Sequence, residues 1–254
     1  KNSSSSLYEI DKQNNYILNV GKVTFCSLLV MATSPIRAEI KVVTTIKPLH
    51  SLIANVMDGV GEPSLIIDGS TSPHSFTLKP SHAKLLEEAD LIFWVGEGIE
   101  TFMERPIESI VKNAEVVKFM EVESIEKLKF REESIFDDHD DHDEDYDDDH
   151  DDHNHGEFNS HIWLDPSNAK KMVHEISHEL GDLDPANKDK YEANAEATIV
   201  ALDQLINDVS KDINKDAKFV VFHDAYQYFE ERFGLRAAGA LTLNTDVLPG
   251  AKQI

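Results

Sequence analysis

Short apolar runs alternate with amphipathic stretches in the first half of the chain. β-Branched and aromatic residues dominate four of these runs, which we predict as strands at 40–46, 64–67, 91–95 and 116–119. Apolar residues recur at helical spacing between them, which predicts helices over 49–57, 81–89 and 100–112, with Ser81 as an N-cap. Strands that alternate with helices are typical of a parallel sheet. The pattern therefore predicts an α/β lobe over residues 39–184.

Two similar helix start signals follow. Asp165-Pro166 combines a capping carboxylate with proline at the first helical position, and we expect the helix that it begins to end at Gly181. Asp184-Pro185 repeats the signal, and apolar positions then recur at steps of three or four residues. This spacing predicts a helix of about 28 residues, or about 42 Å. We interpret residues 185–214 as a helix that links two lobes.

A second α/β unit is predicted at the end of the chain. It consists of a strand at 218–222, a helix at 225–233 that Gly234 ends, and a strand at 235–243. One such unit buries too little apolar surface to be stable alone. We therefore interpret residues 215–254 as an incomplete second lobe and expect that the chain is truncated at its C-terminal side.

The N-terminal region contains a candidate export signal. Residues 23–32 form an apolar run that is too short to span a bilayer as a helix. Lys22 precedes the run, and Ala38 follows as a small residue at a suitable cleavage position. We predict that residues 1–38 are an N-terminal extension with a signal peptide cut after Ala38; the alternative is a buried strand or helix.

Charge excludes one class of partner and singles out one segment. The 254 residues include 48 acidic and 24 basic side chains, for a net charge of -24, which argues against a nucleic-acid partner. Residues 137–155 hold twelve of the acidic residues, no Lys or Arg, and five histidines. We predict a loop that collects Zn²⁺ with low affinity, the alternative being a solvated charged loop. Its histidines are His139, His142, His150, His153 and His155.

Three further histidines lie where open α/β sheets usually bind ligands, in loops next to predicted strands or helix starts. His74 follows the strand at 64–67, His161 precedes the capped helix at Asp165, and His223 follows the strand at 218–222. Three neutral imidazoles with an open fourth position can hold Zn²⁺. The alternative for each one alone is a surface or hydrogen-bonded histidine.

A second zinc motif competes with these three residues. His174, Glu175 and His178 form HExxH on a predicted helix, where two imidazoles one turn apart can share a zinc ion and the glutamate can act as a general base. Glu192 or Glu196 could add a third ligand. A zinc metalloprotease is therefore an alternative function. Apolar residues of the same helix favour a packing role instead.

Three blocks of sequence resemble one known family. They are SPHSFTLKPSHAKLLEEADLIFWVGEGIETFMERP, HGEFNSHIWLDPSNA and FVVFHDAYQYFEERFGL. Together they are similar to the periplasmic zinc-binding component of bacterial high-affinity zinc ABC transporters, the ZnuA family. The resemblance runs from about residue 42 to the end of the chain and includes the His-rich insertion.

The resemblance implies both a fold and a function. The fold is a two-lobed periplasmic metal-binding protein with a long linking helix and metal in the cleft between the lobes. His74, His161 and His223 would be the ligands of a transported Zn²⁺, and a membrane permease would be the partner of a monomeric protein that catalyses no reaction. A third imidazole, at the position where manganese-binding relatives place a carboxylate, favours zinc.

Two departures from the family pattern leave the fourth ligand open. Pro73 stands where some zinc members carry a glutamate, and relatives continue through further strands and helices that include a cleft-facing carboxylate. A non-transporting zinc buffer built on residues 137–155 is the remaining alternative.

Overall fold

The first sheet is parallel throughout, as its alternation with helices predicts. The computed structural model describes residues 39–131 and 157–242, all within one compact unit, Glu39–Ile254. Its four strands pair in the order β2-β1-β3-β4, with Val43 opposite both Ser64 and Ile92. Their bounds are β1 Val42–Thr44, β2 Ser64–Leu65, β3 Leu91–Trp94 and β4 Glu115–Lys118. All four predicted strands of the first sheet are confirmed, each shorter than or shifted from its predicted range.

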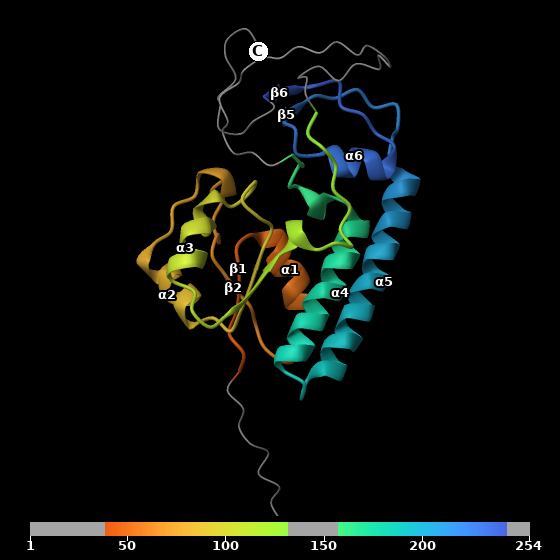
Figure 1. Cartoon of the computed structure of the whole chain (residues 1–254). Coiled ribbons are helices and arrows are strands. Elements are labelled where there is room, and N and C mark those ends of the chain that lie inside the picture. Colours follow the sequence, from red (N-terminus) through yellow and green to blue (C-terminus); the bar gives the residue numbers. More distant parts are fainter. Residues whose placement is uncertain (1–38, 132–156, 243–254) are drawn as a thin grey trace, which may run out of the picture. The chain divides into compact units, whose positions relative to one another are not determined.

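Helices lie on both sides of this sheet. Figure 1 shows α2 and α3 on one side and α1, α4 and α5 on the other. The helices are α1 Lys47–Val56, α2 Pro80–Glu88, α3 Glu104–Ser109, α4 Pro166–Leu183, α5 Lys188–Asp212 and α6 Gln227–Phe233. Four 3-10 turns complete the fold, η1 Pro73–Ser75, η2 Thr101–Met103, η3 Phe119–Glu121 and η4 Ile162–Leu164. Among the described residues, no helix is long and apolar enough to cross a membrane.

The main core fills the space between the sheet and its helices. Every residue of β3 is buried, which is expected because a central parallel strand is covered on both faces. Leu49 and Ile53 of α1 are fully buried against this layer, and Tyr191 of α5 joins the same cluster. Helix α5 therefore packs on the first sheet's helices over part of its length.

Helix α4 has the predicted capping residue at its start but not the predicted terminating residue at its end. Asp165 accepts a hydrogen bond from the Ser167 backbone N–H at 2.8 Å, so the predicted cap of α4 is confirmed. The prediction that Gly181 ends α4 is wrong, because the helix continues to Leu183. A Cβ at Gly181 would lie 3.1 Å from Cγ of Lys188. The glycine thus permits close approach of α5 and does not stop the helix.

Two other predicted helix starts are also wrong. Helix α2 begins at Pro80 with Lys79 in the N-cap position, so Ser81 lies inside the first turn. Helix α5 begins at Lys188 after Asn187, and not at Pro185. The Asp184 carboxylate accepts hydrogen bonds from the Asn187 side chain at 2.7 Å and from the Tyr191 hydroxyl at 3.1 Å. It therefore stabilises the turn between α4 and α5.

The predicted helix over 100–112 is broken because Glu100 turns back toward the sheet. Its φ and ψ of -117° and 63° are not helical, and only η2 and α3 form beyond it. The fully buried carboxyl group accepts hydrogen bonds from the Thr45 hydroxyl at 2.5 Å and from the Val95 and Gly96 backbone N–H groups at 3.3 and 3.1 Å. Burial raises the pKa of Glu100 to about 7 even though these donors favour the charged form.

The second sheet is small. Strands β5 Val221–His223 and β6 Ala240–Thr242 pair in parallel, with α6 between them in sequence. Gly234 ends α6 in the left-handed conformation at φ 67°, as predicted. Phe222 and Val220 are more than half exposed, so this sheet has a partly open apolar surface among the described residues.

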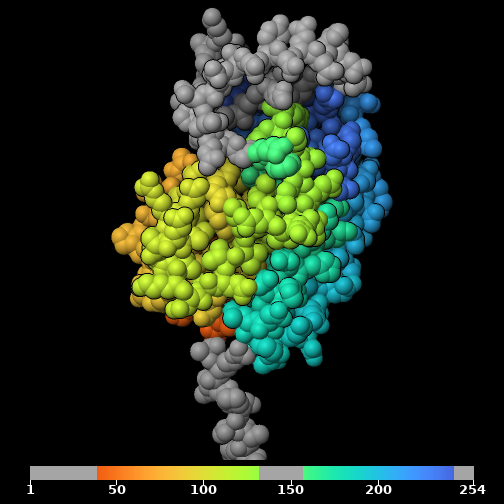
Figure 2. Space-filling model, viewed as in Figure 1, coloured from red at the N-terminus to blue at the C-terminus, as the bar shows by residue number. Residues whose placement is uncertain are grey.

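Buried and partly buried polar contacts attach α6 to the rest of the unit. Arg232 binds the Asp165 carboxylate through two hydrogen bonds of 2.6 and 2.7 Å. The Tyr228 hydroxyl donates to the Asn159 carbonyl at 2.6 Å and accepts from the Leu128 backbone N–H at 2.9 Å. Figure 2 shows the light green surface that leads to residue 131 in contact with the blue surface of this region. The attachment therefore joins three segments that are distant in sequence.

Removing the hydroxyl in Tyr228→Phe should lower the free energy of unfolding by about 1–3 kcal/mol, because a buried N–H and a buried carbonyl lose their partner. Tyr226→Phe is the matched control, since Tyr226 is 47% exposed and Tyr228 only 2%. Urea unfolding of both variants measures the difference. Equal stability of Tyr228→Phe and the unchanged protein would contradict the structural role given to this hydroxyl.

Glu100 should make stability fall as the pH rises from about 4.5 to about 7, because the folded state then holds a proton that the unfolded state releases. Its contribution is fully present below pH 4.5 and is lost as the pH passes the folded-state pKa. Glu100→Gln should remove this pH dependence of the free energy of unfolding, which amounts to on the order of 3 kcal/mol between about pH 4.5 and about pH 7. Unfolding curves at several pH values test this, and an unchanged slope in the variant would contradict it.

Candidate metal centre

Three histidines from distant parts of the sequence meet at one place. His74 lies in η1 after β2, His161 stands immediately before η4, and His223 is the last residue of β5. One nitrogen from each ring lies within 4.8 Å of the nitrogens of the other two. Among the residues that the structure describes, this is the one group of three or more histidine, cysteine or acidic side chains that is close enough to hold a metal ion.

The spacing of two of these rings already matches metal coordination. His161 Nε2 and His223 Nε2 are 3.4 Å apart. Two nitrogen donors at 2.0–2.1 Å from a tetrahedral zinc ion are about 3.4 Å apart. His74 completes the group, with its ring centroid 5.6 Å from that of His161 and 6.0 Å from that of His223. The geometry suits one small cation shared by three imidazoles.

Sheet topology explains the positions of His74 and His223. His74 comes after the carboxyl end of β2 and His223 lies at the carboxyl end of β5, which is where open α/β sheets present ligand-binding groups. His161 follows no strand. Its segment is instead held by an antiparallel bridge between Lys129 and Phe158 and by the Asn159 N–H, which donates to the Leu128 carbonyl at 2.8 Å.

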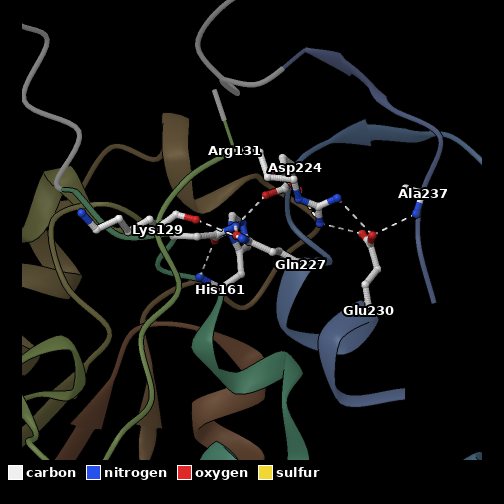
Figure 3. Close-up of polar contacts among 8 residues, drawn as sticks. Lys129, Arg131, His161, Asp224, Gln227, Glu230 and Ala237 are labelled. Atoms are coloured by element: carbon white, nitrogen blue, oxygen red, sulfur yellow. Dashed lines mark hydrogen bonds and ion pairs between the residues drawn. The ribbon is translucent and has the colours of Figure 1, made fainter. Parts of the chain in front are cut away.

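Asn159 contacts His161 directly. Its Oδ1 lies 2.8 Å from His161 Nδ1 and accepts the His161 backbone N–H at 3.1 Å. Its Nδ2 donates to the Asp224 carbonyl at 2.9 Å and to Gln227 Oε1 at 3.1 Å. Gln227 in turn donates to the Lys129 carbonyl at 3.0 Å. Figure 3 labels His161, Asp224, Gln227 and Lys129, which these contacts bring together.

Charged groups next to the site are paired with arginine. Arg131 makes two hydrogen bonds of 3.0 and 3.1 Å to Glu230, and its Nη2 lies 3.2 Å from Oδ1 of Asp224 (Figure 3). Asp224 is 2% exposed, and burial raises its pKa to about 6 although Arg131 acts in the opposite direction. Glu230 also accepts the Ala237 backbone N–H at 2.9 Å. The cluster includes Asp224, the residue directly after His223.

The environment of the histidines favours neutral rings. His161 is 8% exposed, and burial, with smaller contributions from His223 and His74, lowers its pKa to about 3. Burial also lowers the pKa of His223. A neutral imidazole keeps a lone pair for a metal ion, whereas a protonated ring cannot bind one.

The structure does not bring the HExxH residues into a comparable group. His174 and His178 lie on the exposed side of α4 and line a cavity of about 340 Å³ with Lys188, Glu192 and Glu196. Among the described residues, His174, His178, Glu192 and Glu196 belong to no group of three metal donors that lie within 4.8 Å of one another. Nε2 of His178 instead lies 3.8 Å from Oδ2 of Asp182 on the same helix.

Not every predicted site residue lies in the described part of the chain, and not every residue that supports the site was predicted. The histidines of the acidic run, His139, His142, His150, His153 and His155, lie outside the described residues. Asn159 and Tyr228 support the site but were not identified from the sequence. The position of Asn159 two residues before His161 was the available signal, since a side chain so close can bond to the ring.

The chain matches one protein family and is similar to named zinc-uptake proteins. The family model for the zinc-uptake complex component A, periplasmic, matches residues 42–254. The high-affinity zinc uptake system protein ZnuA of Brucella abortus (strain 2308) is 44% identical over 235 residues, which cover 84% of this chain and 70% of that protein. The ZnuA protein of Yersinia pestis is 35% identical over 240 residues, 90% of this chain and 74% of that protein.

Solved structures share the fold at lower identity. A crystal structure of ZnuA aligns with a TM-score of 0.66 and 22% identity, over 84% of this chain and 74% of that one. The Zn(II)-bound ZnuA-like domain of Streptococcus pneumoniae AdcA aligns with a TM-score of 0.62 and 23% identity, over 85% of this chain and 72% of that one. The matched family model and the identity to these relatives show that the chain belongs to the family of periplasmic zinc-uptake complex component A, ZnuA.

Proposed function

We propose that this chain is the periplasmic zinc receptor of an ABC transporter, which captures Zn²⁺ and delivers it to a membrane permease. The observation that carries the proposal is the convergence of one nitrogen each from His74, His161 and His223 within 4.8 Å. Membership of the family supports the same function. In this proposal zinc is the cargo, and the protein acts as a monomer and leaves the ion chemically unchanged.

The donor set supports zinc over harder cations. Three imidazole nitrogens suit a borderline-soft ion, whereas manganese and magnesium prefer carboxylate, carbonyl and water oxygens. Three protein ligands also leave one position of a tetrahedral ion for a further ligand. Burial of His161 in its neutral form adds to the affinity, because the site need not release a proton from that ring when the ion enters.

Zinc affinity should fall at least tenfold in each of the variants His74→Ala, His161→Ala and His223→Ala, because each removes one of three direct donors. Competition with a calibrated chelator measures the tight site without interference from weaker sites. His178→Ala is the matched control, since its side chain is 61% exposed and lies outside the group. Unchanged affinity in all three site variants would overturn the proposal.

The acidic run at 137–155 is proposed to collect Zn²⁺ weakly near the receptor. Deleting these residues should reduce the number of weakly bound zinc ions while the affinity of the tight site stays the same. A second variant with all five histidines of the run changed to asparagine keeps its carboxylates and separates imidazole binding from charge. Isothermal titration measures both. Loss of the tight site on deletion would favour the zinc buffer instead.

A further inference from the structure

We propose that Asn159 is a positioning residue that holds His161 in the one tautomer able to bind zinc through Nε2 and joins it to the chain that carries His223. The proposal rests on the function proposed above. One buried amide would thus hold His161 and His223, two ligands from different parts of the fold, in position before zinc binds.

The orientation of the Asn159 amide follows from its neighbours. The His161 backbone N–H can only donate, and it lies 3.1 Å from Oδ1. The Asp224 carbonyl can only accept, and it lies 2.9 Å from Nδ2. Exchanging the two ends of the amide would place donor against donor and acceptor against acceptor. The oxygen therefore faces His161 and the nitrogen faces Asp224.

This orientation determines the tautomer of His161. Oδ1 of Asn159 carries no proton, so His161 Nδ1 at 2.8 Å must be the donor of their hydrogen bond. A neutral imidazole with its proton on Nδ1 has its free lone pair on Nε2. Nε2 is the atom that lies 3.4 Å from His223 Nε2. The amide thus directs the lone pair of His161 to the place where the rings converge.

The same amide connects His161 to His223. Its Nδ2 binds the backbone carbonyl of Asp224, the residue directly after His223, and also binds Gln227 at the start of α6. Asn159 is itself fully buried, and its carbonyl accepts the Tyr228 hydroxyl at 2.6 Å. Each hydrogen-bonding group of this residue is therefore engaged, and its side chain has little freedom to reorient.

The effect on the metal is predicted from general coordination chemistry. A partner that accepts the second ring proton of a ligating histidine fixes the ring and raises its basicity, and loss of such partners weakens metal binding about 10- to 100-fold. Without Asn159 Oδ1, the His161 ring can rotate or carry its proton on Nε2. Both changes take the lone pair away from the ion.

The test measures zinc affinity and tautomer in the full chain. Asn159→Ala should weaken zinc binding about 10- to 100-fold, and the loss should be smaller when the change is added to His161→Ala, because only the link to the chain of His223 then remains to be lost. In ¹⁵N spectra without metal, His161 should carry its proton on Nδ1 in the unchanged protein and shift toward the other tautomer in Asn159→Ala. Asn194→Ala is the matched control, because that amide also donates to two backbone carbonyls, at 2.9 Å each, far from the site.

The outcomes separate this proposal from the proposed function. If His161→Ala binds zinc as the unchanged protein does, the receptor assignment fails. If His161→Ala loses zinc while Asn159→Ala keeps both the affinity and the tautomer, the positioning role of Asn159 is overturned. Should Asn159→Ala fail to fold, Asn159→Asp decides, since it keeps an acceptor for Nδ1 and loses the donor to Asp224. His161 should then keep its proton on Nδ1 with weakened zinc binding, and a neutral His161 ring protonated on Nε2 alone would overturn the proposal.

Discussion

The metal centre depends on the attachment of the β5–α6 segment to residues 157–165. His223 lies on one side of this contact and His161 on the other, and their nitrogens are 3.4 Å apart. Tyr228, Arg232 and Asn159 make the contact through short hydrogen bonds. A hydrogen bond between neutral groups contributes only about 0.5–1.5 kcal/mol net and one to a charged group about 1.5–3 kcal/mol, and leaving a buried group unpaired is itself costly. Hydrogen bonds with defined donors and acceptors therefore fix the geometry of this contact.

Burial raises the pKa of the Asp224 carboxyl group and lowers the pKa of the histidines in this region. The carboxylates Asp224 and Glu230 stay next to Arg131, which offsets part of the cost of burying their charge. Burial instead lowers the pKa of His161 and His223, because a ring removed from water favours its uncharged form. The result is a pair of uncharged donors beside a cluster in which one arginine faces two carboxyl groups. A divalent cation can then enter without displacing protons from these rings.

The first sheet provides the platform for this arrangement. Its four strands were predictable as apolar runs flanked by helical patterns, and the two central strands, β1 and β3, are buried along their whole length because helices cover both faces. Helix ends were less predictable. Asp165 does cap α4, yet the similar Asp184-Pro185 pair lies in a turn, because Tyr191 and Asn187 bind that carboxylate in the folded chain. Gly181 likewise serves close packing with Lys188.

The sequence by itself determined the strand and helix order, the parallel character of the first sheet and the three loop histidines as candidates. These features follow from local spacing and from residue chemistry, which are readable without a fold. Tertiary structure decided that His74, His161 and His223 meet while His174 and His178 do not join a third donor within the described residues. It also decided the role of Asn159, because hydrogen bonds to Asp224 and Gln227 join residues more than 60 positions apart. Convergence over such distances depends on how whole segments pack, and no local pattern encodes it.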